Sequence, residues 1–234
     1  MSGTLHGIGV GPGDPELMTL KAARLIGACP VVAWPAPLAG DSFARRIAAA
    51  HIRPDAVEIA IRMPLAADRF PVAAVYDAAA ATIGGHLGAG RDVAVLCEGD
   101  PFLYGSFMYL FARLAERWPT EIVPGVTSLV ACAAAARRPL ASGGDVLAVV
   151  PAPLPDETIR ARLEGCDAAA IVKLGRHLPR VRGVLAAAGL LDRATYVAHA
   201  SLPQARVVPL AGFDAATAPY FSMILVHRAG GVPA

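Results

Sequence analysis

Short apolar runs alternate along the chain with longer amphipathic segments, and this alternation constrains the fold more than any other feature of the sequence. A strand–helix repeat of this kind predicts a mostly parallel sheet that is covered by helices on both faces. We therefore expect an α/β fold. The strand-like runs cover residues 5–10, 31–34, 57–61 and 93–96, and the helix-like segments cover residues 19–26, 42–50 and 72–87.

The pattern starts again after a helix expected at about 106–116, which Trp118 and Pro119 end. Three strands near the C-terminus follow one another without intervening helices, which predicts an antiparallel addition to a second sheet. We expect two α/β lobes, residues 1–118 and 119–234, with a ligand site in the cleft between them. The expected strands of the second half are 121–123, 146–150, 169–174, 195–199, 206–210 and 222–227, and its expected helices are 127–136, 156–163 and 178–188.

The composition argues against several classes of protein. Of the 234 residues, 55% are hydrophobic and 17% are charged, yet no apolar run approaches the roughly 18 residues that a membrane helix needs. The first residues lack the basic and then apolar pattern of a signal peptide, so we expect a cytoplasmic protein that does not bind membranes. A net charge of +2 gives no reason to expect a nucleic-acid partner.

The four cysteines, Cys29, Cys97, Cys132 and Cys166, lie far apart in the sequence. No Cys-x-x-Cys pair and no paired histidine spacing accompanies them, so the sequence does not predict a zinc site. We interpret the four side chains as buried, reduced thiols, and we expect no bound metal.

The first glycine-rich turn is Gly-Ile-Gly-Val-Gly-Pro-Gly-Asp-Pro at residues 7–15. Glycine lets a ligand approach the backbone, and open α/β sheets bind ligands at the carboxyl ends of their strands. The spacing does not fit the dinucleotide fingerprint, because Pro12 or Asp14 replaces the last glycine in the two reading frames. No Gly-Lys pair of a phosphate loop follows either. A cofactor turn and a purely structural turn both stay open.

The second turn, Cys-Glu-Gly-Asp-Pro-Phe-Leu-Tyr-Gly-Ser at residues 97–106, places two carboxylates at a strand end. Acidic groups repel phosphate, so Glu98 and Asp100 further weaken a nucleotide interpretation and suit a positively charged ligand. Asp100 also has the position of a residue that merely caps a turn or a helix. The tripeptide Gly-Asp-Pro occurs at 13–15 and again at 99–101, each time after an apolar strand.

The third turn is Val-Pro-Gly-Val-Thr-Ser at residues 123–128. The hydroxyl group of Thr127 or Ser128 either caps the helix that follows or, with the neighbouring backbone amides, holds polar atoms of a ligand. Taken alone, the turn does not separate these two roles.

In their order and spacing the three turns resemble the tetrapyrrole methylase family, the class III methyltransferases. Its members begin with a strand and a Gly-x-Gly-Pro-Gly-Asp-Pro turn, then carry a Gly-Asp-Pro loop near residue 100 and a Val-Pro-Gly-x-Thr/Ser-Ser turn, all present here. The resemblance covers the whole chain. It implies two α/β lobes of the tetrapyrrole methylase type, S-adenosyl-L-methionine as methyl donor in the cleft, S-adenosyl-L-homocysteine as product, and a homodimer.

Finer detail resembles the branch of this family that methylates C-20 of precorrin-2 to give precorrin-3A in cobalamin biosynthesis. The most specific piece is Tyr-Gly-Ser-Phe-Met-Tyr at residues 104–109, and the segments 12–22, 173–176 and 219–222 also match the branch. Cobalt-factor II, the substrate of the anaerobic pathway, is an alternative, because both branches share these motifs. A tetrapyrrole-binding protein without turnover is a second alternative, because a fold does not fix a function.

Position by position, the resemblance implies a set of contacts to the methyl donor. Pro12 would line the adenosine side, and Leu174 would pack near the adenine. Many relatives have Gln followed by Arg before the penultimate strand, whereas Ala205 precedes Arg206 here, which puts the contacts of the 200–206 loop in doubt. The full implied set is Pro12, Glu98, Gly99, Asp100, Leu103, Thr127, Ser128, Leu174, Ala200 and Ser201.

The implied substrate carries carboxylates around its rim, for which arginine is the expected partner. Any single one of the candidate arginines is better explained as a solvated surface residue, and Tyr104 either stacks on the macrocycle or belongs to a core. No catalytic residue is predicted, because the C-20 carbon is already nucleophilic and the protein mainly has to align the reactants. The candidate substrate-binding residues are Arg45, Arg46, Arg62, Tyr104 and Arg176.

Overall fold

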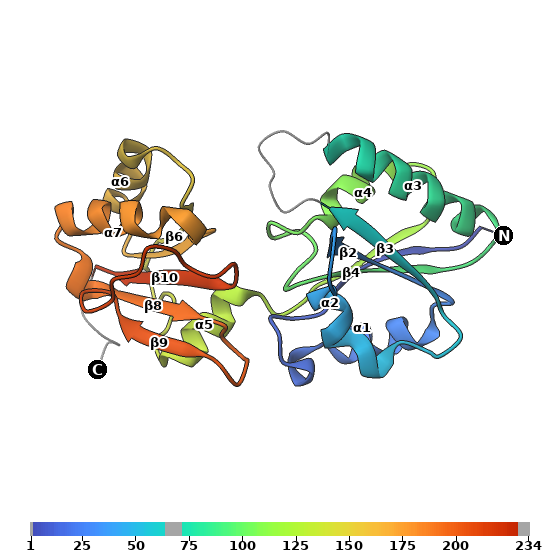
Figure 1. The fold of residues 1–234 in the computed structure, drawn as a ribbon, viewed down its shortest axis with the longest axis horizontal. Coiled ribbons are helices and arrows are strands. Elements are labelled where there is room, and N and C mark those ends of the chain that lie inside the picture. Colours follow the sequence, from blue (N-terminus) through green and yellow to red (C-terminus); the bar gives the residue numbers. More distant parts are fainter. Residues whose placement is uncertain (1, 64–71, 229–234) are drawn as a thin grey trace. The chain divides into compact units, whose positions relative to one another are not determined.

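The computed structural model describes residues 2–63 and 72–228 of the chain. The chain divides into two compact units, Met1–Thr127 and Ser128–Ala234. Each unit has its own five-stranded sheet with helices on both faces (Figure 1). The expected α/β class is therefore confirmed, with one α/β body in each half of the chain.

The sheet of the first unit has the strand order β3-β2-β4-β1-β5, and every neighbouring pair in it is parallel. Because all five strands run in the same direction, their carboxyl ends lie along one edge. The loops that leave this edge include the three turns singled out in the sequence. The strands are β1 (Leu5–Gly9), β2 (Val31–Pro37), β3 (Val57–Met63), β4 (Val93–Cys97) and β5 (Thr120–Val123).

Helices cover both faces of this sheet, which explains why its central strands are apolar without alternation. One face carries α1 (Leu20–Ala28) and α2 (Phe43–Ala48), and the other carries α3 (Val72–Gly88) and α4 (Phe107–Leu114) (Figure 1). Short 3-10 turns at Pro15–Leu17 and Ala49–His51 precede α1 and follow α2.

Side-chain caps fix the starts of α1 and α2. Thr19 Oγ1 accepts the backbone N–H of Ala22 at 3.1 Å, and Ser42 Oγ accepts that of Arg45 at 3.4 Å. Hydroxyl residues are favoured at this position because they satisfy one of the backbone donors that the first turn leaves without a partner. The helix starts expected near residues 19 and 42 are thus confirmed.

The end of the first unit differs from the expected boundary after residue 118. β5 pairs in parallel with β1, Leu5 opposite Thr120, so residues 120–123 form the edge of the first sheet. The expected division places this strand in the second lobe, whereas the first compact unit extends to Thr127. The place of β5 in the sheet is set by hydrogen bonds to a strand more than a hundred residues earlier. The order of elements along the chain does not reveal this pairing.

The sheet of the second unit has the order β6-β7-β10-β8-β9. β6 and β7 are parallel, whereas β10 is antiparallel to both β7 and β8, and β8 is antiparallel to β9. The antiparallel addition expected from the last three strands is confirmed. The strands are β6 (Leu147–Pro151), β7 (Ala168–Val172), β8 (Ala194–Ala198), β9 (Arg206–Pro209) and β10 (Ser222–His227).

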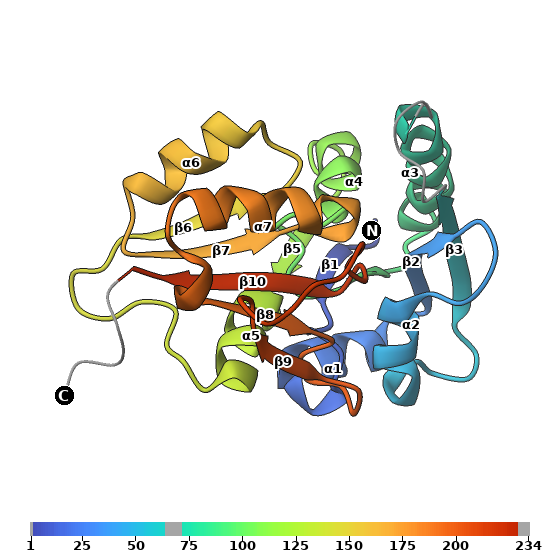
Figure 2. The same cartoon turned by 60° about the vertical axis from the view of Figure 1, so that its left-hand side comes forward.

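Helices again cover both faces of this sheet (Figure 2). α6 (Asp156–Glu164) and α7 (Leu178–Ala187) pack on one face, and α5 (Ser128–Ala136) packs on the other. Two short 3-10 turns, Gly175–His177 and Leu191–Arg193, precede and follow α7.

All four cysteines are free and buried, as expected. Burial raises the pKa of the thiols of Cys29, Cys97 and Cys132 to about 12, so these groups stay protonated at neutral pH. In the described part of the chain, no helix has the length and apolar character needed to cross a membrane.

Candidate functional site

Three loops meet at the carboxyl edge of the first sheet, after β1, β4 and β5. Gly99 N donates to Gly11 O at 2.7 Å and Gly11 N donates to Gly99 O at 3.3 Å, which closes a short antiparallel bridge between the first two loops. Val10 N adds a bond to Cys97 O at 2.9 Å. The first two motifs of the sequence are therefore one hydrogen-bonded structure.

The glycines of these loops are required by backbone packing. A Cβ atom on Gly125 would lie 2.0 Å from the carbonyl oxygen of Gly99, and one on Gly9 would lie 2.6 Å from the same oxygen. Gly99 itself has φ +64° and Gly11 has φ +83°, values that glycine adopts without strain. The structural explanation of the glycine pattern is thus correct in part, since the three loops touch backbone to backbone.

The carboxylate of Asp100 joins two of the loops. Its Oδ1 atom accepts the N–H of Phe102 at 2.9 Å, and its Oδ2 atom accepts the N–H of Gly125 at 3.1 Å. Asp14 repeats the first contact, accepting the N–H of Glu16 at 2.9 Å. The repeated Gly-Asp-Pro tripeptide therefore has a structural explanation. In both copies the aspartate carboxylate accepts the N–H of the residue two positions later and so closes a turn.

Glu98 lies directly after β4 and is partly buried. Burial raises the pKa of its carboxyl group above the ordinary value, and the nearby backbone N–H groups of Glu98 and Ala44 offset part of that rise. Ala44 is in the first turn of α2, a segment that the sequence did not connect with Glu98. No local pattern signals this contact, because the two residues come together only when α2 packs beside β4.

The remaining predicted contacts of the first unit differ in exposure. Pro12 is partly buried beside the glycine bridge, and Leu103 is 38% exposed. Tyr104 is 48% exposed and has φ +57°, a left-handed conformation that non-glycine residues rarely adopt. Such strain is found preferentially at functional sites, and here it falls in the loop that follows Asp100. Thr127, at the end of the unit, is partly buried.

Three candidate arginines lie in the first unit and have different environments. Arg45 donates to both carboxylate oxygens of Glu58 at 2.6 and 3.0 Å, and its guanidinium lies 5.5 Å from the Trp34 ring centroid. Arg62 donates to two backbone carbonyls, Pro37 O and Gly40 O. Arg46 is exposed, with its guanidinium 5.3 Å from the ring centroid of Phe43. Of the three, only Arg46 shows no hydrogen bond or ion pair within the described residues.

In the second unit, four predicted residues follow the carboxyl ends of β7 and β8. Both strands are antiparallel to β10, which lies between them, so their carboxyl ends share one edge of the sheet. The strain is concentrated there too, with φ +60° at Lys173, +52° at His199 and +69° at Ser201. This edge brings together Leu174, Arg176, Ala200 and Ser201.

The side chain of Leu174 is 0% exposed within the core of the second unit. Only its backbone is left to meet a ligand. His199 keeps a buried Nδ1 atom without a hydrogen-bond partner in the described part of the chain, and its backbone N–H donates to Phe221 O at 2.8 Å. Ser128 is exposed at the first position of α5.

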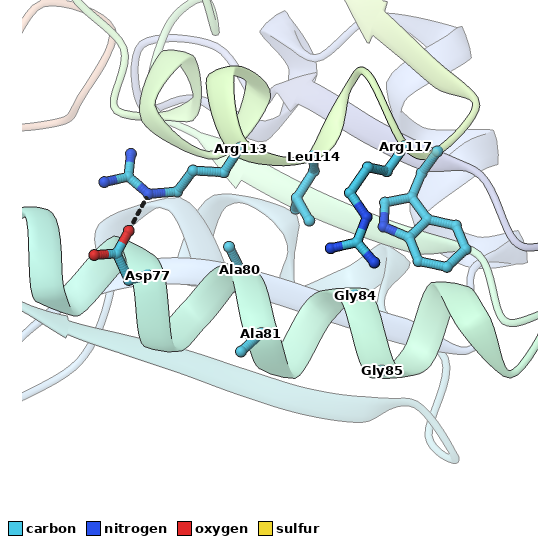
Figure 3. Close-up of a pocket in the computed structure, with 9 residues that line it drawn as sticks. Asp77, Ala80, Ala81, Gly84, Gly85, Arg113, Leu114 and Arg117 are labelled. Atoms are coloured by element: carbon cyan, nitrogen blue, oxygen red, sulfur yellow. Dashed lines mark hydrogen bonds and ion pairs between the residues drawn. The ribbon is translucent and has the colours of Figure 1, made fainter.

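A cavity of about 520 Å³ lies between α3 and α4 (Figure 3). Asp77 and Arg113 point toward each other beside it, with Oδ1 2.7 Å from Nε. Small residues of α3, including Ala81 and Gly84, line the same side as Asp77, and Arg117 faces them from the side of Arg113 (Figure 3). None of the residues predicted to bind a donor or substrate lines this cavity, so we do not assign the site to it.

The comparisons with known proteins agree with the resemblance seen in the sequence. The family model described as Tetrapyrrole (Corrin/Porphyrin) Methylases matches residues 4–214. The chain is 40% identical over 232 residues to a precorrin-2 C(20)-methyltransferase of Sinorhizobium sp, covering 96% of this chain and 95% of that protein. It is 33% identical over 231 residues to a cobalt-precorrin-2 C(20)-methyltransferase of Salmonella typhimurium, with coverages of 97% and 98%.

A third relative, the cobalamin biosynthesis protein CobIJ of Mycobacterium tuberculosis, is 46% identical over 232 residues, which make up 96% of this chain and 46% of CobIJ. Among solved structures, the methyltransferase CobJ has a TM-score of 0.72 at 22% identity, covering 97% of this chain and 95% of that one. Uroporphyrin-III C-methyltransferase of Thermus thermophilus, crystallised with S-adenosyl homocysteine, has a TM-score of 0.71 at 24% identity, with coverages of 97% and 92%. These two likenesses support the fold.

Proposed function

Because this chain belongs to the tetrapyrrole (corrin/porphyrin) methylase family of S-adenosyl-L-methionine-dependent C-methyltransferases, we propose that it methylates C-20 of precorrin-2 to give precorrin-3A. The single observation that carries the choice of substrate is the 40% identity, over almost the whole of both chains, to a precorrin-2 C(20)-methyltransferase. The reaction would be one step of cobalamin biosynthesis.

The three loops of the first unit fit a positively charged methyl donor. Residues 7–15, 97–106 and 123–128 contain Asp14, Glu98 and Asp100 but no Lys or Arg. A group of carboxylates without basic residues repels phosphate and attracts the sulfonium and ammonium groups of S-adenosyl-L-methionine. The acidic loops thus indicate the same class of ligand as the absence of the dinucleotide fingerprint and of the Gly-Lys pair of a phosphate loop.

The proposed donor contacts are those implied by the family resemblance, refined by the structure. Asp100 holds the loops together with both carboxylate oxygens, which fixes the backbone around Gly99. Leu174 would contribute its backbone, because its side chain is buried. We propose as donor-binding residues Pro12, Glu98, Gly99, Asp100 and Leu103 of the first unit, Thr127 at its end, and Ser128, Leu174, Ala200 and Ser201 of the second.

The protein's part in the reaction would be mainly to bind and orient the reactants. When bound, the donor supplies an electrophilic methyl group on sulfur, and the meso carbon at C-20 of the reduced tetrapyrrole is nucleophilic without assistance. Holding both reactants in line is a large part of such a rate enhancement. A weak base or water suffices to accept the proton that C-20 then loses, so we assign no catalytic residue.

For the substrate carboxylates we propose Arg46 as the first candidate, because its guanidinium is exposed and shows no ion pair within the described residues. Arg45 and Arg62 have structural partners, and their part in binding would be indirect. Arg176 remains a candidate at the edge of the second sheet. Tyr104 is exposed enough for its ring to stack on the macrocycle.

The direct test is incubation of the purified protein with precorrin-2 and S-adenosyl-L-methionine. We expect the product to gain the mass of one methyl group, and NMR with a labelled donor to place that group on C-20. The proposal fails if calorimetry detects no binding of S-adenosyl-L-homocysteine, or if the methyl group appears at another carbon.

A cobalt-bearing substrate is the second candidate, favoured by the 33% identity to a cobalt-precorrin-2 C(20)-methyltransferase. Parallel assays with precorrin-2 and with cobalt-factor II separate the two, because each candidate predicts the higher kcat/KM for its own substrate. Labelled donor separates both from a binding protein without turnover, which would retain the macrocycle and release no methyl group.

The homodimer and the cytoplasmic location stay predictions. Size-exclusion chromatography with light scattering would test the first, with about twice the chain mass of 24.1 kDa expected. Cell fractionation of the native organism would test the second.

A further inference from the structure

The loop after β4 and the first turn of α4 carry a concentration of exposed apolar side chains. Within the described residues, five large apolar side chains that are exposed fall inside the short segment 102–109. Single exposed apolar residues are common on soluble proteins, whereas contiguous groups of them mark surfaces that bind a ligand or a partner. The members of this group, which we call the aromatic face, are Phe102, Leu103, Tyr104, Met108 and Tyr109.

Two rings of the aromatic face are held by other aromatic rings behind them. Tyr109 is 47% exposed, and its ring centroid lies 4.9 Å from that of Tyr76 on α3, which is only 2% exposed. The ring of Phe102 packs edge-on against that of Phe111, with 5.2 Å between the centroids. Part of each ring is therefore fixed against the first unit, while the rest is open to solvent.

The backbone of the aromatic face is fixed at both ends. At its start, the N–H of Phe102 donates to Asp100 Oδ1 at 2.9 Å. At its end, Arg113 Nη1 donates to the carbonyl oxygen of Tyr109 at 2.8 Å, while Arg113 Nε binds Asp77 on α3 (Figure 3). A surface that is already ordered in this way loses little conformational freedom when a ligand binds to it.

The aromatic face adjoins the loops to which we assign the methyl donor. It begins two residues after Asp100, whose carboxylate also ties this loop to Gly125. Methyl transfer requires the accepting carbon to approach the sulfonium methyl in line, so the acceptor must lie beside these loops. Residues 101–112 contain no Asp, Glu, Lys, Arg or His. No charge in this segment therefore repels an acceptor with carboxylates at its rim.

We propose that the ring system of the tetrapyrrole substrate stacks on the aromatic face, with Phe102 and Tyr109 as its fixed rings. The identity of this ligand rests on the proposed function. Contacts between π-systems are favourable beyond the apolar area that they bury. The uncharged face takes the macrocycle, and the carboxylates at the rim are left to solvent and to arginines.

Met108, exposed on the first turn of α4, allows a test by charge. Met108→Glu places a carboxylate on the aromatic face, and Met108→Gln places a neutral group of the same size there. We expect KM for precorrin-2 to rise at least tenfold in Met108→Glu and less than about threefold in Met108→Gln, because the new charge is desolvated and repels the substrate carboxylates. An acidic residue in the first turn stabilises a helix, so unfolding would not explain the rise.

Val57→Glu is the matched control for the added charge. Val57 is 45% exposed at the start of β3, and the parallel sheet places that end opposite the donor loops. The same substitution there should leave KM for precorrin-2 unchanged.

Tyr109 supplies a second test. Tyr109→Phe keeps the ring and Tyr109→Ala removes it, so KM for precorrin-2 should rise about tenfold in the alanine variant and stay within about threefold in the phenylalanine variant. Anaerobic calorimetry with precorrin-2 in the absence of donor should show the same loss of affinity. The affinity for S-adenosyl-L-homocysteine should change by less than about threefold in all variants, because the donor loops stay intact.

The proposal is overturned if the native protein methylates precorrin-2 while Met108→Glu and Tyr109→Ala leave KM and precorrin-2 affinity unchanged. It is also overturned if S-adenosyl-L-homocysteine affinity falls as much as precorrin-2 affinity, or if light scattering shows that these substitutions split a dimer. In the last case the aromatic face would join two copies of the chain. Failure of the proposed function looks different, since the native protein itself would then neither bind nor methylate precorrin-2, and the ligand named here would be excluded with it.

Discussion

The Oδ2 atom of Asp100 accepts the backbone N–H of Gly125 at 3.1 Å, while Oδ1 of the same carboxylate accepts the N–H of Phe102. One side chain thus ties the loop after β4 to the loop after β5. The bridge between Gly11 and Gly99 adds the loop after β1. The three glycine-rich turns therefore behave as one structure.

Replacing Asp100 with alanine should destabilise the first unit and abolish donor binding. Two backbone donors lose a charged acceptor, for which we expect a loss of about 1–3 kcal/mol in the free energy of unfolding. Urea denaturation and calorimetry with S-adenosyl-L-homocysteine would measure the two effects. Asp145→Ala is the control, because its carboxylate accepts the Ser142 N–H in an exposed loop of the second unit, and it should leave the affinity unchanged.

Gly125→Ala should destabilise the protein more than the addition of a single methyl group suggests. The added Cβ would lie 2.0 Å from Gly99 O, so one of the two loops has to move. We expect a loss of about 3 kcal/mol in stability, at the upper end for overpacking, and at least tenfold weaker binding of S-adenosyl-L-homocysteine. Gly85→Ala in α3 is the matched control. A Cβ there has open space, and helix propensity predicts a gain of about 0.5–1 kcal/mol. Equal effects of both substitutions would contradict the packing argument.

Arg45→Ala and Arg46→Ala should affect different properties. Arg45→Ala removes the bidentate pair with Glu58, both side chains being about 40% exposed, and should cost about 0.2–1 kcal/mol of stability. Arg46→Ala should leave the thermal midpoint unchanged and raise KM for the tetrapyrrole severalfold. Thermal denaturation of both variants would measure the loss of stability, and steady-state kinetics would measure the change in KM. An unchanged KM in Arg46→Ala would exclude this residue from the substrate site.

The Lys21–Glu121 ion pair should give the first unit a pH-dependent contribution to stability. The ammonium of Lys21, and more weakly His6, hold the pKa of the Glu121 carboxyl below its usual value. A lowered folded-state pKa stabilises the protein above the unfolded-state pKa, and this contribution disappears as the pH falls through the folded-state pKa.

Lys21→Met should therefore lower the free energy of unfolding at pH 7 by a few tenths of a kcal/mol, discounted because Lys21 and Glu121 are 49% and 38% exposed. At about pH 3 the variant and the native protein should be equally stable in urea denaturation. Arg24→Met on the same helix is the control, because Arg24 forms no ion pair with the described residues, and it should show no pH-dependent difference.

Glu98 should give the opposite dependence on pH. Its folded-state pKa is raised by burial, so ionising the carboxyl costs stability as the pH rises through that pKa. Relative to the native protein, Glu98→Gln should be at least as stable at pH 8 and should lose this advantage near pH 4, where both side chains are neutral. Urea denaturation at the two pH values measures the difference, and a variant that is less stable only at high pH would contradict the assigned shift.

Local patterns predicted much of the fold. Periodicity predicts strands that begin at residues 31, 57 and 93, and capping residues predict helix starts near Thr19 and Ser42. The structure has all of these elements at the expected places. Edge strand β5 was assigned to the wrong half of the expected division, because a four-residue strand shows its partner only through pairing.

For the site, the sequence found the three turns but not all the reasons for their residues. It identified Glu98 and Asp100 as acidic groups at a strand end, and the structure gave Asp100 a backbone partner from a distant segment, the N–H of Gly125. It offered Leu174 as an adenine contact, and the structure buries that side chain in a core. An apolar residue after a strand has the same local pattern in either role.

The sequence by itself determined the α/β class, the family and the acidic, glycine-rich turns, because periodicity, spacing and charge are properties of neighbours along the chain. Only the tertiary structure decided that Gly9, Gly99 and Gly125 pack backbone to backbone, and that the Asp100 carboxylate accepts the N–H of Gly125. These relations join residues far apart in the sequence, and they come into existence only when parallel strands bring their carboxyl ends to one edge of a sheet.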